Sequence, residues 1–233
     1  MSQKLIRMQE SIKQNCSCDD GCHICKSKAN RLSKYQEAGI PAFFWDKSFK
    51  GFGGNKIFKS KMEPYVKDLD SWYDSGKSLF LVGNLGTGKS YVSCCFLKLA
   101  IVKGYSGMYT TMMDCVNNIV HSRDSNFLDK VLNKDFLIID EFDSRWIFPS
   151  EKSEQIFSSN MEFILRTRFQ NMLPTVLCSN TSEIDNVLKG FHSKAFSSLK
   201  TKYGDVVYTA GGDLRRQNAV SYTHLRAHET SRY

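Results

Sequence analysis

Eight residues that follow a short apolar segment have the types and the spacing needed to bind phosphate. Residues 83–90 match the GxxxxGK[ST] pattern of phosphate-binding loops in full, and residues 79–82 (LFLV) are typical of a strand that leads into such a loop. The eight are Gly83, Asn84, Leu85, Gly86, Thr87, Gly88, Lys89 and Ser90. Glycines let backbone N–H groups converge on phosphate oxygens, and the N-terminus of a following helix adds a favourable dipole. The sequence therefore predicts a nucleotide-phosphate site.

Two side chains of this loop have distinct expected roles. Lys89 is expected to reach the β- and γ-phosphates, and the Ser90 hydroxyl is expected to ligate Mg²⁺. Residues 91–102 are mostly apolar and predict a buried helix that stops at Gly104. A strand before the loop and a helix after it argue against a chance glycine-rich turn.

A pair of acids supplies the second half expected of a nucleotide hydrolase. Asp140 ends the apolar segment 135–140 (DFLIID), and Glu141 follows it. We expect Asp140 to hold Mg²⁺ through water and Glu141 to polarise the attacking water as general base. The alternative is that Asp140 and Glu141 form an ordinary solvated acidic turn after a strand, which gives the same sequence pattern. The position of the pair, about fifty residues after Lys89, strengthens the catalytic interpretation.

Two more polar residues follow expected strands. Asn180 follows the segment 174–178 and is predicted to orient the attacking water or touch the γ-phosphate, although Asn is also a common turn residue. Arg215, with Arg216 beside it, follows the segment 206–209. Its guanidinium is a candidate to bridge nucleotide phosphates, and a solvated pair of arginines is the alternative.

Four of the eight cysteines fall within ten residues, in the pattern C-x-C-x₃-C-x₂-C. They are Cys16, Cys18, Cys22 and Cys25. Thiolates this close in a reducing compartment indicate a metal rather than disulfides, and four sulfurs suit tetrahedral Zn²⁺. His23 is a possible replacement ligand, while an iron–sulfur cluster and unligated thiols are the alternatives. Zinc ligands usually come in two separated pairs, and this cluster is tighter.

The segments that position these residues alternate between strand and helix patterns, which indicates an α/β fold with a parallel sheet. The remaining expected strand covers residues 107–111, and further helices are expected at 114–122 and 153–170. Residues 1–15, 26–40 and 62–75 also have helical patterns. The aromatic and basic segment 41–61 is interpreted as a connector that docks onto the core, with stacking on nucleic-acid bases as the alternative. Cys94, Cys95, Cys115 and Cys178 lie in apolar segments and are expected in the core.

Composition narrows the class of protein. The chain has 233 residues, enough for one ordinary domain plus a small appendage, and 41% of them are hydrophobic. We see no apolar run long enough for a bilayer and no secretory segment, so we expect a cytoplasmic location and no membrane partner. The net charge of +8 favours an acidic partner such as nucleic acid, with a generally basic surface as the alternative.

The C-terminal end is treated separately. Residues 220–230 (VSYTHLRAHET) resemble the in-frame translation of a sequencing-library adapter, so we expect the natural sequence to be cut short near Ala219 in this chain. We therefore assign no site to His224 or His228.

The order of these motifs resembles the AAA+ ATPases of the helicase-loader type, the DnaC/DnaI family, and the related IstB-type transposition ATPases. The resemblance covers roughly residues 41–218 and is strongest at residues 165–180 (LRTRFQNMLPTVLCSN) and at GGDLRR, residues 211–216. It implies an AAA+ P-loop core that hydrolyses ATP and associates with copies of itself. In the terms of this family, Asn180 matches sensor 1 and Arg215 matches sensor 2. The cysteine-rich N-terminal segment resembles the zinc-binding module with which proteins of the DnaI branch engage a helicase. Phage replication proteins of this kind are similar.

One departure from this family concerns its arginine finger. The nearest counterpart of the Ser-Arg-Leu triplet is Ser197-Ser198-Leu199, and residues 188–203 contain four lysines but no arginine. Lys200 or Lys202 is a candidate substitute, but a lysine lacks the bidentate fork of arginine. Weak activity and a finger elsewhere in the chain are the alternatives. Arg168 is interpreted either as an interface residue or as a solvated helix-end charge.

The resemblance gives an expected domain plan and function. Residues 1–40 form the zinc-binding helicase-interaction module, 41–61 the connector, 62–219 the AAA+ domain and 220–233 the adapter-derived tail. The expected function is ATP-dependent loading of a replicative DNA helicase onto single-stranded DNA. The alternatives are an IstB-like transposition ATPase that binds duplex DNA and a transposase, and a nucleotide-dependent binding module with little hydrolysis.

Overall fold

A parallel sheet forms the centre of the molecule. The computed structural model describes residues 3–14, 22–121, 124–142, 150–180, 204–211 and 213–214. Within them the sheet has five strands in the order β2-β3-β4-β1-β5, and every neighbouring pair is parallel. The strands are β1 (Ser78–Gly83), β2 (Gly107–Thr111), β3 (Phe136–Asp140), β4 (Thr175–Ser179) and β5 (Gly204–Thr209). The predicted parallel α/β sheet is confirmed.

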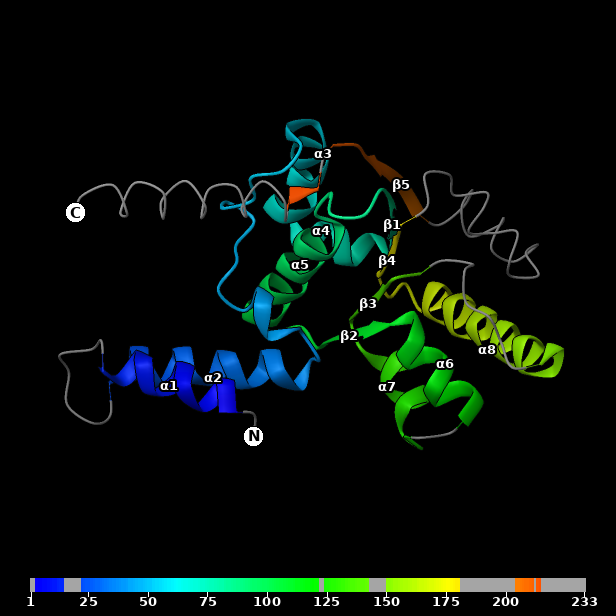
Figure 1. Cartoon of the computed structure of the whole chain (residues 1–233), viewed down its shortest axis with the longest axis horizontal. Helices are drawn as coiled ribbons and strands as arrows, with labels where there is room; N and C mark the ends of the chain where they lie inside the picture. Colours follow the sequence, from blue (N-terminus) through cyan, green and yellow to red (C-terminus); the bar gives the residue numbers. More distant parts are fainter. Residues whose placement is uncertain are drawn as a thin grey trace, which may run out of the picture.

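Helices cover both faces of the sheet (Figure 1). One face packs against α3 (Lys56–Lys67), α4 (Leu69–Ser75) and α5 (Lys89–Lys103). The other packs against α6 (Met112–His121), α7 (Phe127–Asn133) and α8 (Glu151–Gln170). Alternate side chains of a strand point to opposite faces, so Leu79 and Leu81 join the first core while Phe80 and Val82 join the second. Two separate cores therefore hold the sheet in the middle layer.

The region 56–75 differs from the sequence-based expectation. One helix was expected over residues 62–75, but α3 begins earlier and α4 is separate. Asn55 caps α3 by accepting a hydrogen bond from the Phe58 amide, and Asp68 caps α4 by accepting one from the Ser71 amide. Helical spacing of apolar residues continues across such a break, so the pattern alone cannot reveal it. Helix α7 was not predicted at all.

The connector docks onto the core, as predicted. Phe52 and Trp45 are buried, and the buried side chain of Lys98 in α5 donates hydrogen bonds to the backbone carbonyls of Phe44, Trp45 and Lys47. A lysine head group is an effective anchor here because it can satisfy three carbonyls at once. The short 3₁₀ helix η1 (Ala42–Phe44) lies within this anchored stretch.

Arg168, near the end of α8, is completely buried, so both sequence-based interpretations of it are wrong. Its guanidinium donates to the carbonyls of Val131, Lys134 and Pro174 at 2.7–2.9 Å and to the hydroxyl of Thr175 at 2.9 Å. Burial lowers the pKa of Arg168 to about 10, which still leaves it charged at neutral pH. Arg168 therefore joins α8 to the turn between α7 and β3.

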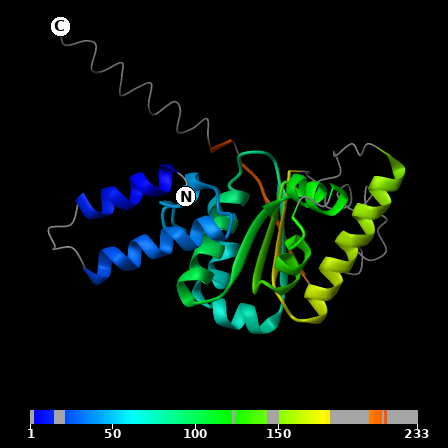
Figure 2. The same ribbon diagram turned by 90° about the horizontal axis from the view of Figure 1, so that it is seen from below.

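The N-terminal residues form a helical hairpin beside the sheet domain. Helices α1 (Gln3–Gln14) and α2 (His23–Glu37) lie against each other and project from the body of the molecule (Figure 2). The last turns of α2 carry Leu32 and Tyr35 into the same core as α3–α5. The boundary expected at residue 40 stays a prediction. No helix in the described part of the chain is long and apolar enough to span a bilayer.

Candidate nucleotide-binding site

The predicted phosphate loop joins β1 to α5, the strand–loop–helix arrangement that phosphate binding requires. Gly86 and Gly88 have φ angles of +77° and +95°, which favour glycine, and Gly88 is the N-cap residue of α5. The buried ammonium group of Lys89 donates to the carbonyls of Gly83 and Asn84, each at 2.8 Å. Lys89 therefore lies folded over the loop that phosphates would enter.

Two glycines of this loop are also required by close contacts that the sequence does not reveal. A Cβ atom on Gly88 would lie 2.4 Å from the ring of Phe52, and one on Gly86 would lie 2.1 Å from a carboxylate oxygen of Asp213. The amide of Leu214 donates to the Gly86 carbonyl at 3.0 Å. The connector and the start of the GGDLRR motif thus both contact the phosphate loop.

Asp140 ends β3 at the carboxyl edge of the sheet and is 5% exposed. The hydroxyl of Tyr109 donates to its Oδ2 at 2.7 Å, and the amide of Glu141 donates to its Oδ1 at 2.8 Å. Burial first, and then the charge of Asp140, raises the pKa of Tyr109, so this hydroxyl keeps its proton and acts as donor. A carboxylate has about four acceptor positions, so two accepted bonds leave capacity for a metal-bound water. Asp140 therefore fits a Mg²⁺ site.

Two of the other expected catalytic residues, Glu141 and Asn180, lie at the same edge of the sheet. Glu141 has an exposed side chain and a φ of +55°, a backbone strain that is uncommon outside glycine and often found at functional sites. Val82 pairs with Ser179, so Asn180 leaves β4 beside the start of the phosphate loop. Arg215, Lys200 and Lys202 lie outside the described residues.

Two buried cysteines lie in elements that flank the candidate site. Burial first, and then the charge of Asp140, raises the pKa of both Cys94 in α5 and Cys178 in β4. The positive charge of Lys89 acts in the opposite direction on the pKa of Cys178. Cys94, Cys95, Cys115 and Cys178 are all buried, as predicted.

Only half of the cysteine cluster lies in the described residues. Cys22 is the N-cap of α2 and Cys25 lies in its first turn, where desolvation and then contact with Cys22 raise the pKa of Cys25. Cys16 and Cys18 lie outside the described residues. Among the residues that are described, no group of three or more His, Cys, Asp or Glu side chains is arranged to hold a metal ion. The zinc assignment stays a prediction.

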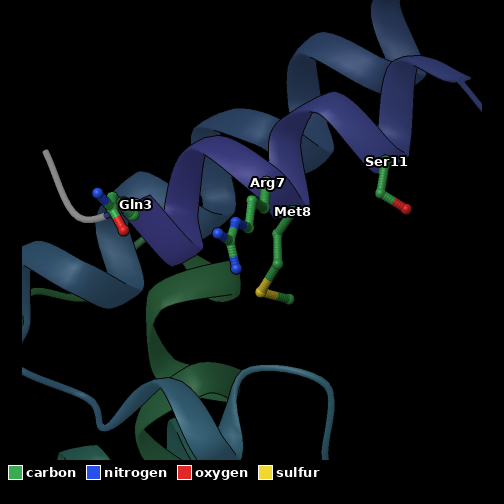
Figure 3. Close-up of a pocket in the computed structure, with 4 residues that line it drawn as sticks. All are labelled: Gln3, Arg7, Met8 and Ser11. Atoms are coloured by element: carbon green, nitrogen blue, oxygen red, sulfur yellow. The ribbon is translucent and has the colours of Figure 1, made fainter.

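A separate pocket lies on the N-terminal hairpin (Figure 3). Its lining residues Gln3, Arg7, Met8 and Ser11 all come from α1, and Met8 also packs against the core. None of them belongs to the phosphate loop or to the strand ends around it, so this pocket is not part of the nucleotide site.

Comparison with solved structures identifies the fold. A DnaC helicase loader matches with a TM-score of 0.61 at 17% identity, over 73% of this chain and 100% of that chain. DnaI matches with a TM-score of 0.61 at 17% identity, over 75% of this chain and 93% of that chain. AMPPCP-bound DnaA from Aquifex aeolicus matches with a TM-score of 0.59 at 17% identity, over 76% of this chain and 53% of that chain. No curated protein matches the sequence.

The fold is that of the DnaC and DnaI structures, and a complete phosphate loop joins its strand β1 to helix α5. The sequence model of the family described as "IstB-like ATP binding protein" matches residues 58–179, slightly more than half of the chain. The chain belongs to this family. The matched segment includes the phosphate loop and the Asp140–Glu141 pair, and it ends one residue before Asn180.

Proposed function

We propose that this protein loads a replicative DNA helicase onto single-stranded DNA in an ATP-dependent cycle. The observation that carries the proposal is the similarity of the fold to the DnaC helicase loader over that chain's full length, together with a complete phosphate loop between β1 and α5 of this chain. A helical hairpin that projects from this core offers a separate surface for a helicase. The net charge of +8 suits contact with DNA phosphates.

The proposed ATP site uses residues from three strand ends. The backbone of residues 83–90 and the Lys89 ammonium would bind the phosphates, while Ser90 and Asp140 would hold Mg²⁺. When bound, Mg²⁺ neutralises phosphate charge. Glu141 would take a proton from the attacking water, and Asn180 would orient that water. These side chains belong to α5, β3 and β4 or follow them directly. Because β3 and β4 are neighbouring parallel strands, their carboxyl ends would present these side chains at one edge of the sheet.

Arg215 and the interface between copies complete the proposal. Arg215 would bridge nucleotide phosphates, since it directly follows Leu214, whose amide already contacts the phosphate loop. Self-association would place a cation from a neighbouring copy at the nucleotide. Lys200 and Lys202 are the proposed substitutes for the arginine finger.

Zinc is proposed to organise the start of α2. Cys22 and Cys25 lie at the start of α2, and Cys16 and Cys18 would complete a four-sulfur set. Because the pKa of Cys25 is raised, zinc would have to displace the proton of this thiol on binding. The metal would link Cys16 and Cys18 to the start of α2 and so help to shape the surface offered to the helicase.

A transposition ATPase is the second candidate, and the family match favours it directly, because the matching family is described as IstB-like. The two candidates differ in their macromolecular partners. A helicase loader requires contact with a hexameric helicase and single strands, whereas the second candidate requires duplex DNA and a transposase.

A binding experiment separates the two. The full chain would be used to capture the replicative helicase of its own organism, with and without ATP, next to a variant in which Cys16, Cys18, Cys22 and Cys25 are serine. Asn30→Ser, an exposed change on the same hairpin, is the matched control. We expect helicase capture by the natural chain and the control, and a loss of at least about tenfold in the cysteine variant. ATP-dependent binding to duplex DNA without helicase capture would establish the second candidate instead.

A further inference from the structure

The contact between Tyr109 and Asp140 is built by the register of the sheet. Tyr109 in β2 pairs with Ile138 in β3, two residues before Asp140. Residues two apart in a strand point to the same face, so Tyr109 is the diagonal neighbour of Asp140 on the side covered by α5. In this register the Tyr109 hydroxyl donates a hydrogen bond of 2.7 Å to Oδ2 of Asp140.

The backbone of Tyr109 is held from the other side by the end of α2. The Tyr109 amide donates to the Ala38 carbonyl at 2.7 Å. Gly39, with φ at +73°, approaches so closely that an added Cβ atom would lie 2.6 Å from the Tyr109 carbonyl oxygen. The base of the N-terminal hairpin therefore contacts the same residue that touches Asp140.

We propose that Tyr109 is a positioning residue that orients the Asp140 carboxylate toward Mg²⁺ and links that carboxylate to the N-terminal hairpin. The inference rests on the proposed assignment of Asp140 to Mg²⁺. With Oδ2 held by the hydroxyl and Oδ1 by the Glu141 amide, the carboxylate has one fixed orientation before metal arrives. Hydrogen bonds of this kind to a metal-binding group typically change metal affinity by about 10–100-fold.

The first test measures metal binding without turnover. Mn²⁺ affinity would be measured by electron paramagnetic resonance in the presence of a non-hydrolysable ATP analogue, and analogue affinity would be measured in EDTA. Tyr109→Phe, which removes only the hydroxyl, is expected to weaken Mn²⁺ binding about tenfold and leave the metal-free analogue affinity within about twofold. A residue that merely fills space would change neither value.

Tyr73→Phe is the matched control. Tyr73 donates to Asp135 at 2.9 Å, at the opposite end of the same strand that carries Asp140. The Tyr73→Phe variant also removes one hydroxyl that donates to a carboxylate, and its Mn²⁺ affinity should match that of the natural chain. Equal Mn²⁺ affinity in Tyr109→Phe and the natural chain would overturn the inference. Unchanged Mn²⁺ affinity in Asp140→Asn would overturn the Mg²⁺ assignment itself, which separates the two failures.

The second test addresses the link to the hairpin. Gly39→Ala is expected to displace Tyr109 and weaken Mn²⁺ binding several-fold in the natural background, but to add nothing in the Tyr109→Phe background. Gly104→Ala is the control, because its φ of +100° imposes similar strain with no atom within 4 Å of the added Cβ. Equal losses from Gly39→Ala in both backgrounds would show independent effects and overturn the link.

Discussion

The Nε atom of Arg168 donates to the hydroxyl of Thr175 across 2.9 Å, where helix α8 ends and strand β4 begins. The same guanidinium reaches back to the carbonyls of Val131 and Lys134 after α7. One side chain thus holds together the junction between α8 and β4 and the turn between α7 and β3, which lie far apart in the sequence. It is the largest fully buried side chain in the described part of the molecule.

Replacing Arg168 should destabilise the fold more than replacing any exposed arginine. Arg168→Leu leaves several buried carbonyls without donors and is expected to lower the free energy of unfolding by about 4 kcal/mol. Arg168→Lys keeps the charge but loses the fork and should lose about 2 kcal/mol. Urea unfolding measures both. Arg166→Leu, exposed on the same helix, is the control and should stay within about 0.5 kcal/mol of the natural chain; an equal loss there would contradict the assignment.

Gly86→Ala should impair nucleotide binding while the fold survives. The added methyl group requires a strained φ of +77° and meets the Asp213 carboxylate at 2.1 Å, so either the loop or residues 213–214 must move. We expect the affinity for ATP to fall at least about tenfold, measured by titration with a fluorescent analogue. Gly104→Ala carries comparable backbone strain away from the loop and should retain its affinity. A Gly86→Ala variant with full affinity would disprove the role of this close contact.

Lys89→Ala should abolish ATP binding. The side chain supplies the only cation of the loop sequence, and the Gly83 and Asn84 carbonyls that it now satisfies indicate how tightly it is held. Calorimetric titration with ATP and Mg²⁺ measures the loss. Lys103→Ala removes an equal charge from the far end of the same helix and serves as the control. Nucleotide affinity retained by Lys89→Ala would rule out the phosphate-loop assignment.

Glu141→Gln should separate binding from hydrolysis. The amide keeps the shape of the side chain but cannot accept a proton, so ATP affinity should persist while the turnover rate falls at least about 100-fold. Phosphate release at saturating ATP gives the rate, and analogue titration gives the affinity. Turnover at the natural rate would remove Glu141 as the general base.

The stability conferred by Tyr73 should depend on pH. Burial acts to raise the pKa of Asp135, but hydrogen bonds from Ser106 and Tyr73 outweigh it and hold that pKa below its ordinary value. A carboxyl with a depressed pKa contributes stability above its unfolded pKa, at about 4, and loses it as pH falls through the folded value. Tyr73→Phe should therefore cost about 1 kcal/mol at about pH 7 and progressively less below about pH 4. Thermal unfolding across this range measures it; a cost independent of pH would contradict the mechanism.

The strands and the phosphate loop could be predicted because their signals are local. An apolar run such as residues 79–82 specifies a buried strand, and the glycine and lysine spacing that follows it is typical of phosphate-binding loops. The boundaries of the helices were harder to predict from the sequence. The break at Asp68 depends on a capping hydrogen bond, and apolar spacing is similar on both sides of it.

Contacts between distant segments could not be predicted. Charge at a helix end normally faces solvent, and the carbonyls that accept from Arg168 are recognisable only once the turn after α7 is in place. The partnership of Tyr109 with Asp140 likewise depends on strand register, which no local pattern in β2 specifies. The phosphate loop alone gave no sign that Phe52 and Asp213 lie against it.

The burial of Arg168 also imposes an order on biosynthesis. The Val131 carbonyl leaves the ribosome 37 residues ahead of the guanidinium that will bind it. Until residues 168–175 have been translated, the stretch 131–135 has only water to satisfy these carbonyls, so strand β3 cannot reach its final dry environment. The end of α8 must therefore be made before the turn after α7 gains the buried donor that satisfies its carbonyls.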